Sequence, residues 1–434
     1  MSVVVVAGTR PEVVKLWPVL KRLDELGLEY FFVWSGQHYD YEMSRVFFEE
    51  LGVRSPDVDL SVGSGSHAEQ TGRIMLGVEK VLGERRPAVT VAQGDTNSVL
   101  AAALASVKVR VPFAHVEAGL RSWSMVMPEE VNRRVADAVA SLHFAPTRLA
   151  ALNLIFEGVS PRGIYVTGNT VVDVIYEQGS RVDALAERLL GDLGLEKAGY
   201  VLATLHRAEN VDDPARLGSI LKALAVLSGS YPVVFPAHPR TLRRVSEFGL
   251  WSLLDKVRVL KPLGYLEFLS LLKNARVVVT DSGGVQEEAF TLKVPTVTVR
   301  YNTERPETTM YGINVLSGAE WERVVGEALK QAERYERIKK LDFENPLGDG
   351  RAGERIANIL REFVESGEGF EEADLRRTPF VLYRLTEGVV PTGEVLACFD
   401  EKGVPRVPPR GQGCWRTLSR FPVSVEDLPE YLKC

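Results

Sequence analysis

Short apolar runs rich in β-branched residues alternate with helical segments along the first 300 residues. The first run, Val3–Ala7, contains no polar residue, and a helical pattern from Pro11 to Leu26 follows it. An apolar run without alternation is typical of a strand that is covered on both faces, as in a parallel sheet. The alternation therefore predicts stacked βαβ units and an α/β fold.

The strand–helix alternation restarts at Tyr200, after a charged helical segment at Val182–Ala198. We therefore predict two Rossmann-like, doubly wound domains, residues 1–180 and 181–350, that face each other across a central cleft. A helical pattern over residues 351–366 is expected to return to the first domain. Open α/β sheets bind ligands beyond the carboxyl ends of their strands, which places the expected site in the cleft.

The chain changes character after Ser366. Short β-like runs at Phe380–Leu385 and Val395–Phe399 are separated by proline-rich turns. This pattern predicts a small appended module over residues 367–434 that contains β structure. The residues do not reveal what this module does.

Charge and cysteine content exclude several classes of protein. The 52 Lys and Arg against 58 Asp and Glu give a net charge of −6, so there is no basic surplus for nucleic-acid binding. The three cysteines do not have the spacing of a zinc site, and we expect neither a metal nor another cofactor. No apolar run reaches the ~20 residues of a membrane span, and the start lacks the charged region of a signal peptide, so we expect a cytoplasmic protein.

Two glycine-containing turns, one in each half, are candidates for binding a phosphate group. Gly8–Glu12 follows the first strand, with Arg10 as a guanidinium clamp and Lys15 about one helical turn further on. Ser282–Gly284 opens a helix that also carries Glu288. Backbone N–H groups at a helix N-terminus bind anions, and a carboxylate further along can bind ribose hydroxyls. A surface arginine and an ordinary helix cap are the simpler alternatives.

Three carboxylates follow strands of the first half and are expected in one pocket: Asp95, Glu117 and Glu129. Burial and mutual repulsion would spread their pKa values, which a site needs if it removes one proton and returns another. The alternative is that acidic residues here enrich the first turn of a helix whose Arg133 forms surface ion pairs. For Glu130 we favour this alternative, and for Asp95 and Glu117 the functional interpretation.

His206 ends the Tyr200–Leu205 strand and is expected to face the cleft from the second half. An imidazolium there can bind phosphate or donate a proton to a leaving group. His238 ends the next strand, where a ligand role and a structural hydrogen bond remain equally open. The pattern does not settle the role of His143, which lies on a strand.

Eight motifs occur in order along the chain: Gly8–Glu12, Gln93–Thr96, His115–Arg121, Pro128–Arg133, Gly168–Thr170, Leu205–Asn210, Asp281–Glu288 and Thr303–Glu307. Together they resemble the motifs of the non-hydrolysing UDP-N-acetylglucosamine 2-epimerases, and the resemblance covers about residues 1–365. One such motif would carry little weight, whereas eight in register are highly specific.

The resemblance implies a GT-B-like arrangement of the two domains, a homodimer and a UDP-N-acetylhexosamine substrate. It also implies reversible epimerisation at C2 by anti elimination of UDP, a 2-acetamidoglucal intermediate and re-addition of UDP. The catalytic residues would be Asp95, Glu117, Glu129 and His206. The substrate-binding residues would be Arg10, Lys15, Arg133, Leu263, Phe268, Ser282, Gly283, Gly284, Glu288 and Arg305, with Leu263 and Phe268 bordering the uracil and Glu288 holding the ribose.

The loop Ser122–Met127 departs from the family pattern, because it is shorter than the loop of the bacterial enzymes and lies where the sugar is expected. It leaves open a 2-epimerase of a modified UDP-sugar, such as a 2,3-diacetamido uronate. A GT-B glycosyltransferase would share the nucleotide site but has no use for several carboxylates around C2. A UDP-sugar sensor is a further alternative, against which the intact set of candidate catalytic residues argues.

Overall fold

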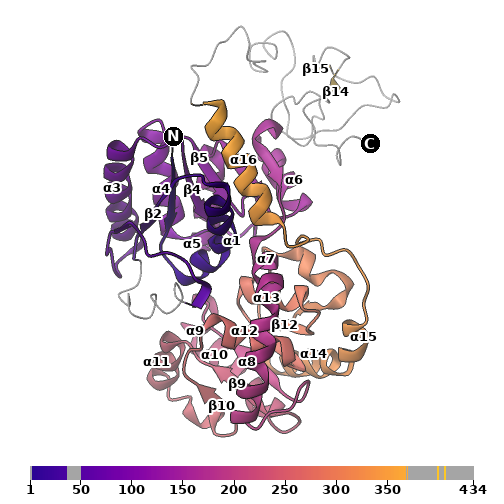
Figure 1. Ribbon diagram of the computed structural model, residues 1–434. Helices are drawn as coiled ribbons and strands as arrows, with labels where there is room; N and C mark the ends of the chain where they lie inside the picture. Colours follow the sequence, from indigo (N-terminus) through magenta and orange to yellow (C-terminus); the bar gives the residue numbers. More distant parts are fainter. Residues whose placement is uncertain (1, 37–49, 368, 370–397, 400–404, 407–434) are drawn as a thin grey trace.

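Two α/β domains lie one above the other in the computed structural model, and the chain passes between them more than once (Figure 1). The structure describes residues 2–36, 50–367, 369, 398–399 and 405–406. Each domain is built on its own parallel sheet, so the two-domain Rossmann-like prediction is confirmed.

The N-terminal domain holds a seven-stranded parallel sheet in the order β3-β2-β1-β4-β5-β6-β7. Its strands are β1 (Val3–Ala7), β2 (Tyr30–Trp34), β3 (Val58–Asp59), β4 (Val89–Gln93), β5 (Phe113–Val116), β6 (Leu142–Ala145) and β7 (Ile164–Val166). Its helices are α1 (Arg10–Leu26), α3 (His67–Arg85), α4 (Asn97–Lys108), α5 (Pro128–Val139), α6 (Arg148–Phe156), η1 (Pro161–Gly163) and α7 (Thr170–Glu177).

Strand β1 explains why this sheet needs helices on both faces. Its side chains are fully buried and alternate between two core clusters, as the pleat of a strand requires. Val3 and Val5 pack beneath α1, whereas Val4 and Val6 pack beneath α3 and α4. A continuous apolar run is stable only in this doubly covered position.

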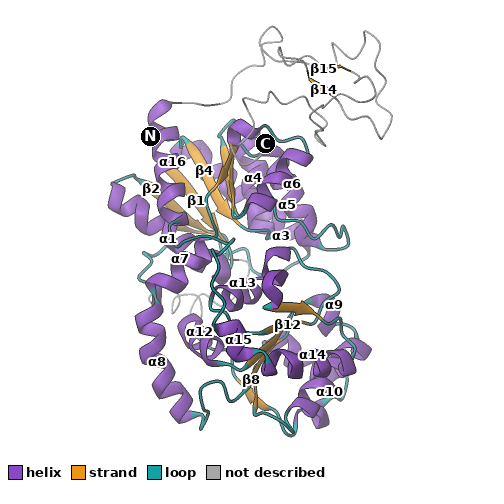
Figure 2. Cartoon of the chain, turned by 90° about the vertical axis from the view of Figure 1, so that its right-hand side faces the viewer, coloured by secondary structure: helices purple, strands orange, loops and turns teal. Residues whose placement is uncertain are grey.

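The C-terminal domain holds a six-stranded sheet in the order β10-β9-β8-β11-β12-β13, and its strands and covering helices are seen together in Figure 2. Its strands are β8 (Val201–Thr204), β9 (Val233–Pro236), β10 (Arg258–Leu260), β11 (Val277–Thr280), β12 (Thr296–Thr298) and β13 (Asn314–Leu316). Its helices are α8 (Gly179–Asp192), α9 (Ala208–Val211), α10 (Pro214–Leu227), α11 (Pro239–Glu247), η2 (Trp251–Leu254), α12 (Tyr265–Asn274), α13 (Gly283–Thr291), η3 (Pro306–Gly312), α14 (Trp321–Glu333) and α15 (Tyr335–Lys339).

Helix α16 (Ala352–Ser366) leaves the second domain and packs against α1 of the first (Figure 1). Its buried residues, among them Ile356 and Leu360, join the core cluster beneath β1. The carboxylate of Asp173 in α7 accepts the N–H groups of Ala352 at 3.1 Å and Gly353 at 2.8 Å. An acidic side chain from a distant helix thus satisfies the free donors at the α16 N-terminus.

The two segments that join the domains touch each other at two glycines. A Cβ added to Gly168 would lie 3.3 Å from the Cα of Gly348, and one added to Gly348 would lie 3.1 Å from the Cα of Gly168. Both glycines have a positive φ, of 89° and 124°. The adjacent Asn169 N–H donates to the Leu347 carbonyl at 2.6 Å. Only glycine allows the two backbones to approach this closely.

Two edge strands were not predicted, β3 and β13, because strands of two and three residues carry too little alternation to be recognised. In the appended module the described residues form the short antiparallel pair β14 (Cys398–Phe399) and β15 (Pro405–Arg406). The expected run Phe380–Leu385 lies outside the described residues. Among the helices that the structure describes, none combines the length and the apolarity needed to cross a bilayer.

Candidate functional site

A cavity of about 1,220 Å³ lies between the two domains, at the carboxyl ends of both sheets. Of the fourteen side chains predicted to form the site, Arg133 alone is absent from its lining. The lining set comprises Arg10, Lys15, Asp95, Glu117, Glu129, His206, Leu263, Phe268, Ser282, Gly283, Gly284, Glu288 and Arg305. The strand-end argument accounts for most of this set. Leu263, Phe268 and Arg305 were expected from the family resemblance alone.

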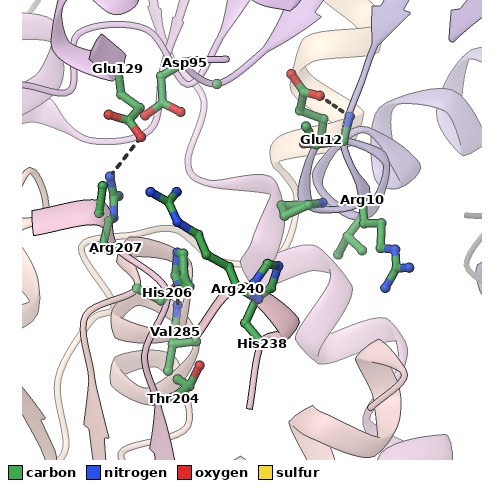
Figure 3. Close-up of a pocket in the computed structure, with 18 of the residues that line it drawn as sticks. Arg10, Glu12, Asp95, Glu129, Thr204, His206, Arg207, His238, Arg240 and Val285 are labelled. Atoms are coloured by element: carbon green, nitrogen blue, oxygen red, sulfur yellow. Dashed lines mark hydrogen bonds and ion pairs between the residues drawn. The ribbon is translucent and has the colours of Figure 1, made fainter. Parts of the chain in front are cut away.

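We call the three carboxylates of the N-terminal domain, Asp95, Glu117 and Glu129, the acid face of the cavity. Asp95 pairs with Arg133, whose Nη2 lies 2.8 Å from its Oδ2. Glu129 lies in the first turn of α5 and reaches Arg207 of the other domain, 3.3 Å from Nη1 to Oε1 (Figure 3). Their side chains are 24% and 37% exposed, so both are accessible to a molecule in the cavity.

Glu117 is the most deeply held of the three. Its Oε1 accepts from Lys15 Nζ at 2.7 Å and from Arg305 Nη2 at 3.0 Å, and its Oε2 accepts from Gln93. Burial acts to raise the pKa of Glu117, but the Lys15 and Arg305 charges outweigh it and lower the pKa to about 2. The sequence predicts that burial and mutual repulsion spread the carboxylate pKa values, whereas at Glu117 two neighbouring cations set the pKa.

Glu287 completes this ion cluster and was missed by the sequence analysis. Its carboxylate accepts from Lys15 at 2.9 Å, from Arg305 Nε at 2.8 Å and from Asn169 at 2.9 Å. The cluster of Lys15, Glu117, Glu287 and Arg305 joins the two domains and is nearly closed to water. The pair Glu287-Glu288 in the sequence could have indicated a second functional carboxylate, but only Glu288 was assigned a role.

Glu130 lies in the first turn of α5 and outside the cavity lining, as the favoured alternative predicts, but the surface ion pairs of that alternative are wrong. Glu130 is fully buried and accepts from the N–H and Oγ of Ser122, from the Trp123 N–H and from Arg133. Arg133 is 1% exposed and lies behind Asp95 rather than on the surface. The N–H groups of the loop before α5 are buried and need acceptors, and the Glu130 carboxylate in the first turn of α5 is that acceptor.

We call the cavity-lining residues around α12 and α13 of the C-terminal domain the nucleotide face: Leu263, Phe268, Ser282–Gly284 and Glu288. Ser282 caps α13 by accepting from the Val285 N–H at 3.5 Å. A Cβ on Gly283 would lie 2.8 Å from Arg305 Nη1, so this glycine lets the guanidinium reach the helix start. Burial raises the pKa of Glu288 to about 8.

His206 follows β8 and enters the cavity beside Arg207 (Figure 3). Its Nδ1 lies 3.3 Å from Asp281 Oδ1, and the same carboxylate accepts the backbone N–H groups of His206 and Arg207. Burial lowers the pKa of His206, against the attraction of Asp281. Asp281 therefore orients the turn that presents the imidazole.

The first glycine turn differs from the expectation. Glu12 accepts the N–H groups of Gly8 at 2.7 Å and Thr9 at 2.6 Å, so these two donors are occupied by the protein's own carboxylate. These two donors serve the cap of α1 and are therefore not available to an anion. Burial raises the pKa of Glu12 to about 7. Arg10, half-buried at the cavity edge, remains the cation of this turn.

Comparisons with known proteins agree with this geometry. The family model described as UDP-N-acetylglucosamine 2-epimerase matches residues 21–361. UDP-N-acetylglucosamine 2-epimerase of Methanocaldococcus jannaschii is 44% identical over 371 residues, which are 83% of this chain and 99% of that protein. UDP-2,3-diacetamido-2,3-dideoxy-D-glucuronate 2-epimerase of Pseudomonas aeruginosa is 42% identical over 364 residues, 83% of this chain and 99% of its own length.

The crystal structure of the Methanocaldococcus jannaschii enzyme in complex with UDP-GlcNAc and UDP superimposes with a TM-score of 0.76 at 42% identity. The match covers 83% of this chain and all of that one. The matched part includes both faces of the cavity, whereas the appended module beyond residue 366 lies past the end of the matching family model. The chain therefore belongs to the UDP-N-acetylglucosamine 2-epimerase family.

Proposed function

We propose that this chain interconverts UDP-N-acetylglucosamine and UDP-N-acetylmannosamine by inverting C2 of the sugar. The observation that carries the proposal is that one cavity joins an acid face to a nucleotide face. The family membership and the 42–44% identity to archaeal 2-epimerases support it.

The chemistry explains why both faces are needed. C2 has no carbonyl beside it, so a carboxylate cannot remove its proton directly. Breaking the bond between C1 and the diphosphate oxygen first develops oxocarbenium character at C1, which acidifies the C2 hydrogen. Loss of UDP and that proton leaves a 2-acetamidoglucal. Return of UDP to C1, with a proton added to the opposite face of C2, inverts the centre.

The acid face would move the protons. Asp95 and Glu129 are the more accessible carboxylates, and we assign proton transfer to them. Glu117, with a pKa of about 2, would remain ionised and hold Lys15 and Arg305 toward the substrate.

The other side of the cavity would hold UDP. Arg10, His206, Arg305 and the α13 N-terminus would bind the diphosphate and stabilise it as it leaves. Glu288 would accept the ribose hydroxyls, and Leu263 and Phe268 would border the uracil. Closure of the two domains over the intermediate would exclude water.

The test is proton NMR of UDP-N-acetylglucosamine with the purified protein in D2O, without added metal or nicotinamide. A UDP-N-acetylmannosamine anomeric signal with deuterium at C2 is expected. Release of UDP with free N-acetylmannosamine would identify a hydrolysing enzyme instead. No change in the substrate would contradict the proposal for this sugar.

The Pseudomonas aeruginosa relative favours a second candidate, an epimerase of a 2,3-diacetamido uronate sugar. The same assay with that UDP-sugar distinguishes the two, since the better substrate has the higher kcat/KM. We also propose a homodimer in the cytoplasm. Light scattering during gel filtration tests the dimer, and cell fractionation tests the location.

A further inference from the structure

We propose that the buried pair His115–Asp137 is a positioning device that fixes the loops carrying Asp95 and Glu117. The inference rests on the proposed function, because it concerns how the acid face is held for that reaction. Neither member of the pair lines the cavity, so their effect on catalysis passes through the residues they hold.

Both nitrogens of the His115 ring face acceptors. His115 lies on β5 and is fully buried, with Nδ1 at 2.6 Å from Asp137 Oδ1 and Nε2 at 2.7 Å from the Gly94 carbonyl oxygen. A carbonyl can only accept, and an ionised carboxylate can only accept. The ring therefore carries two protons and a positive charge, which gives two charge-assisted bonds.

Asp137 joins the second loop to the same pair. Its Oδ2 accepts the Gly119 N–H at 3.1 Å and lies 2.7 Å from Arg121 Nη1. The charged and titratable groups facing His115 are Asp137 from α5, Arg121 from the loop after β5, and His143 from β6. Burial opposes the charge on His115, but the Asp137 carboxylate raises its pKa.

The two held residues flank the catalytic candidates. Gly94 directly precedes Asp95, and Gly119 follows Glu117 by two residues. Glu117 itself has a φ of 72°, a region that residues with a side chain rarely adopt, so its backbone must be held by its surroundings. The His115–Asp137 pair thus forms hydrogen bonds to both loops that carry Asp95 and Glu117, on the side away from the cavity.

Two variants test this. His115→Gln removes the cation and can bond only one of the two partners. Ser106→Ala is the control, because Ser106 is fully buried in the same domain and donates to the Ala102 carbonyl within α4, away from the pair. We expect His115→Gln to lower kcat by roughly 10- to 100-fold through misplaced loops, with the Kd for UDP changed less than about threefold. Ser106→Ala should keep kcat near that of the wild type.

Unchanged kcat in His115→Gln would overturn the proposal, and so would equal losses in both variants, since that pattern indicates general loosening. If His115→Gln does not fold, the wild-type protein labelled with ¹⁵N-histidine decides. Two ring N–H signals for His115, constant from pH 6 to 9, support the pair, and a neutral ring overturns it. A wild-type protein inactive on every UDP-sugar would count against the proposed function, whereas the ring signals would still judge the pair.

Discussion

The acid face and the nucleotide face of the cavity are built in different ways. The carboxylates of the acid face are held by cations, with Asp95 on Arg133 and Glu117 on Lys15 and Arg305. The nucleotide face uses backbone N–H groups at the start of α13 and half-buried apolar side chains. Its one carboxylate, Glu288, has no cation among the ion pairs within the described residues, and burial raises its pKa to about 8.

This difference suggests a division of work. Ion pairs fix charged groups in place, which suits side chains that must meet a proton at a defined position. A helix N-terminus and an apolar wall bind a phosphate and a flat base without reacting with them. Changes on the acid face should therefore alter the rate, and changes on the nucleotide face should alter affinity.

The largest effect is expected from Asp95→Asn, which keeps the shape of the side chain but cannot carry the proton. We expect kcat to fall by about 10² to 10⁴-fold, the usual contribution of a general acid or base. The Kd for UDP should stay within about threefold, because Arg133 keeps its bond to Glu130. NMR rates and calorimetric titration with UDP measure the two quantities. Asp183→Asn, in a surface pair with Lys273, is the control. A weaker affinity for UDP with an unchanged kcat would contradict the assignment of rate to the acid face and affinity to the nucleotide face.

The second effect concerns stability at the place where the faces meet. Glu287→Ala leaves Lys15 and Arg305 buried with one carboxylate fewer, and losing one partner of a buried ion pair costs about 3–5 kcal/mol. The urea midpoint should fall accordingly. Glu354→Ala removes the partner of the exposed Arg351 and should leave the midpoint unchanged. Equal midpoints for the two variants would show that the cluster does not hold the domains together.

The third effect sharpens the comparison through pH. The folded pKa of Glu288, about 8, exceeds its ordinary value of 4.5, so the unfolded chain ionises first and wild-type stability falls as pH rises from 4.5 to 8. Glu288→Gln removes this loss. The variant should match the wild type near pH 4, below the unfolded pKa, and be more stable at pH 9, by urea midpoints at both values.

The same variant should bind UDP at most about tenfold more weakly at pH 7, since Glu288 is then mostly neutral and a neutral hydrogen bond contributes about 0.5–1.5 kcal/mol. The exposed Glu79→Gln is the control and should show neither change. A stability difference independent of pH would mean that Glu288 is ionised in the folded protein.

The fold was predictable because strand and helix patterns are local. Val3–Val6 alone carries the information that its strand is covered on both faces. The position of the cavity was predictable from a general rule, because ligands bind at the carboxyl ends of the strands in open parallel sheets. The short edge strands β3 and β13 escaped because pairing with a neighbour, not their own pattern, makes them strands.

The partners within the site were not predictable in the same way. Lys15 and Glu287 are 272 positions apart, and no periodicity connects them. Glu12 was read as part of an anion-binding turn, whereas its carboxylate occupies the donors of that turn itself. The residue types at strand ends predict which side chains line the cavity. Which carboxylate pairs with which donor or cation depends on the three-dimensional structure.

The contact between Gly168 and Gly348 has a mechanical consequence. Both links between the domains pass through this one point. A rotation of one domain about the point therefore stretches neither link, whereas a sliding displacement would pull on both. We expect the cleft to open and close by rotation about this point, so that Asp95 and Glu129 return to the same residues of the C-terminal domain each time it closes.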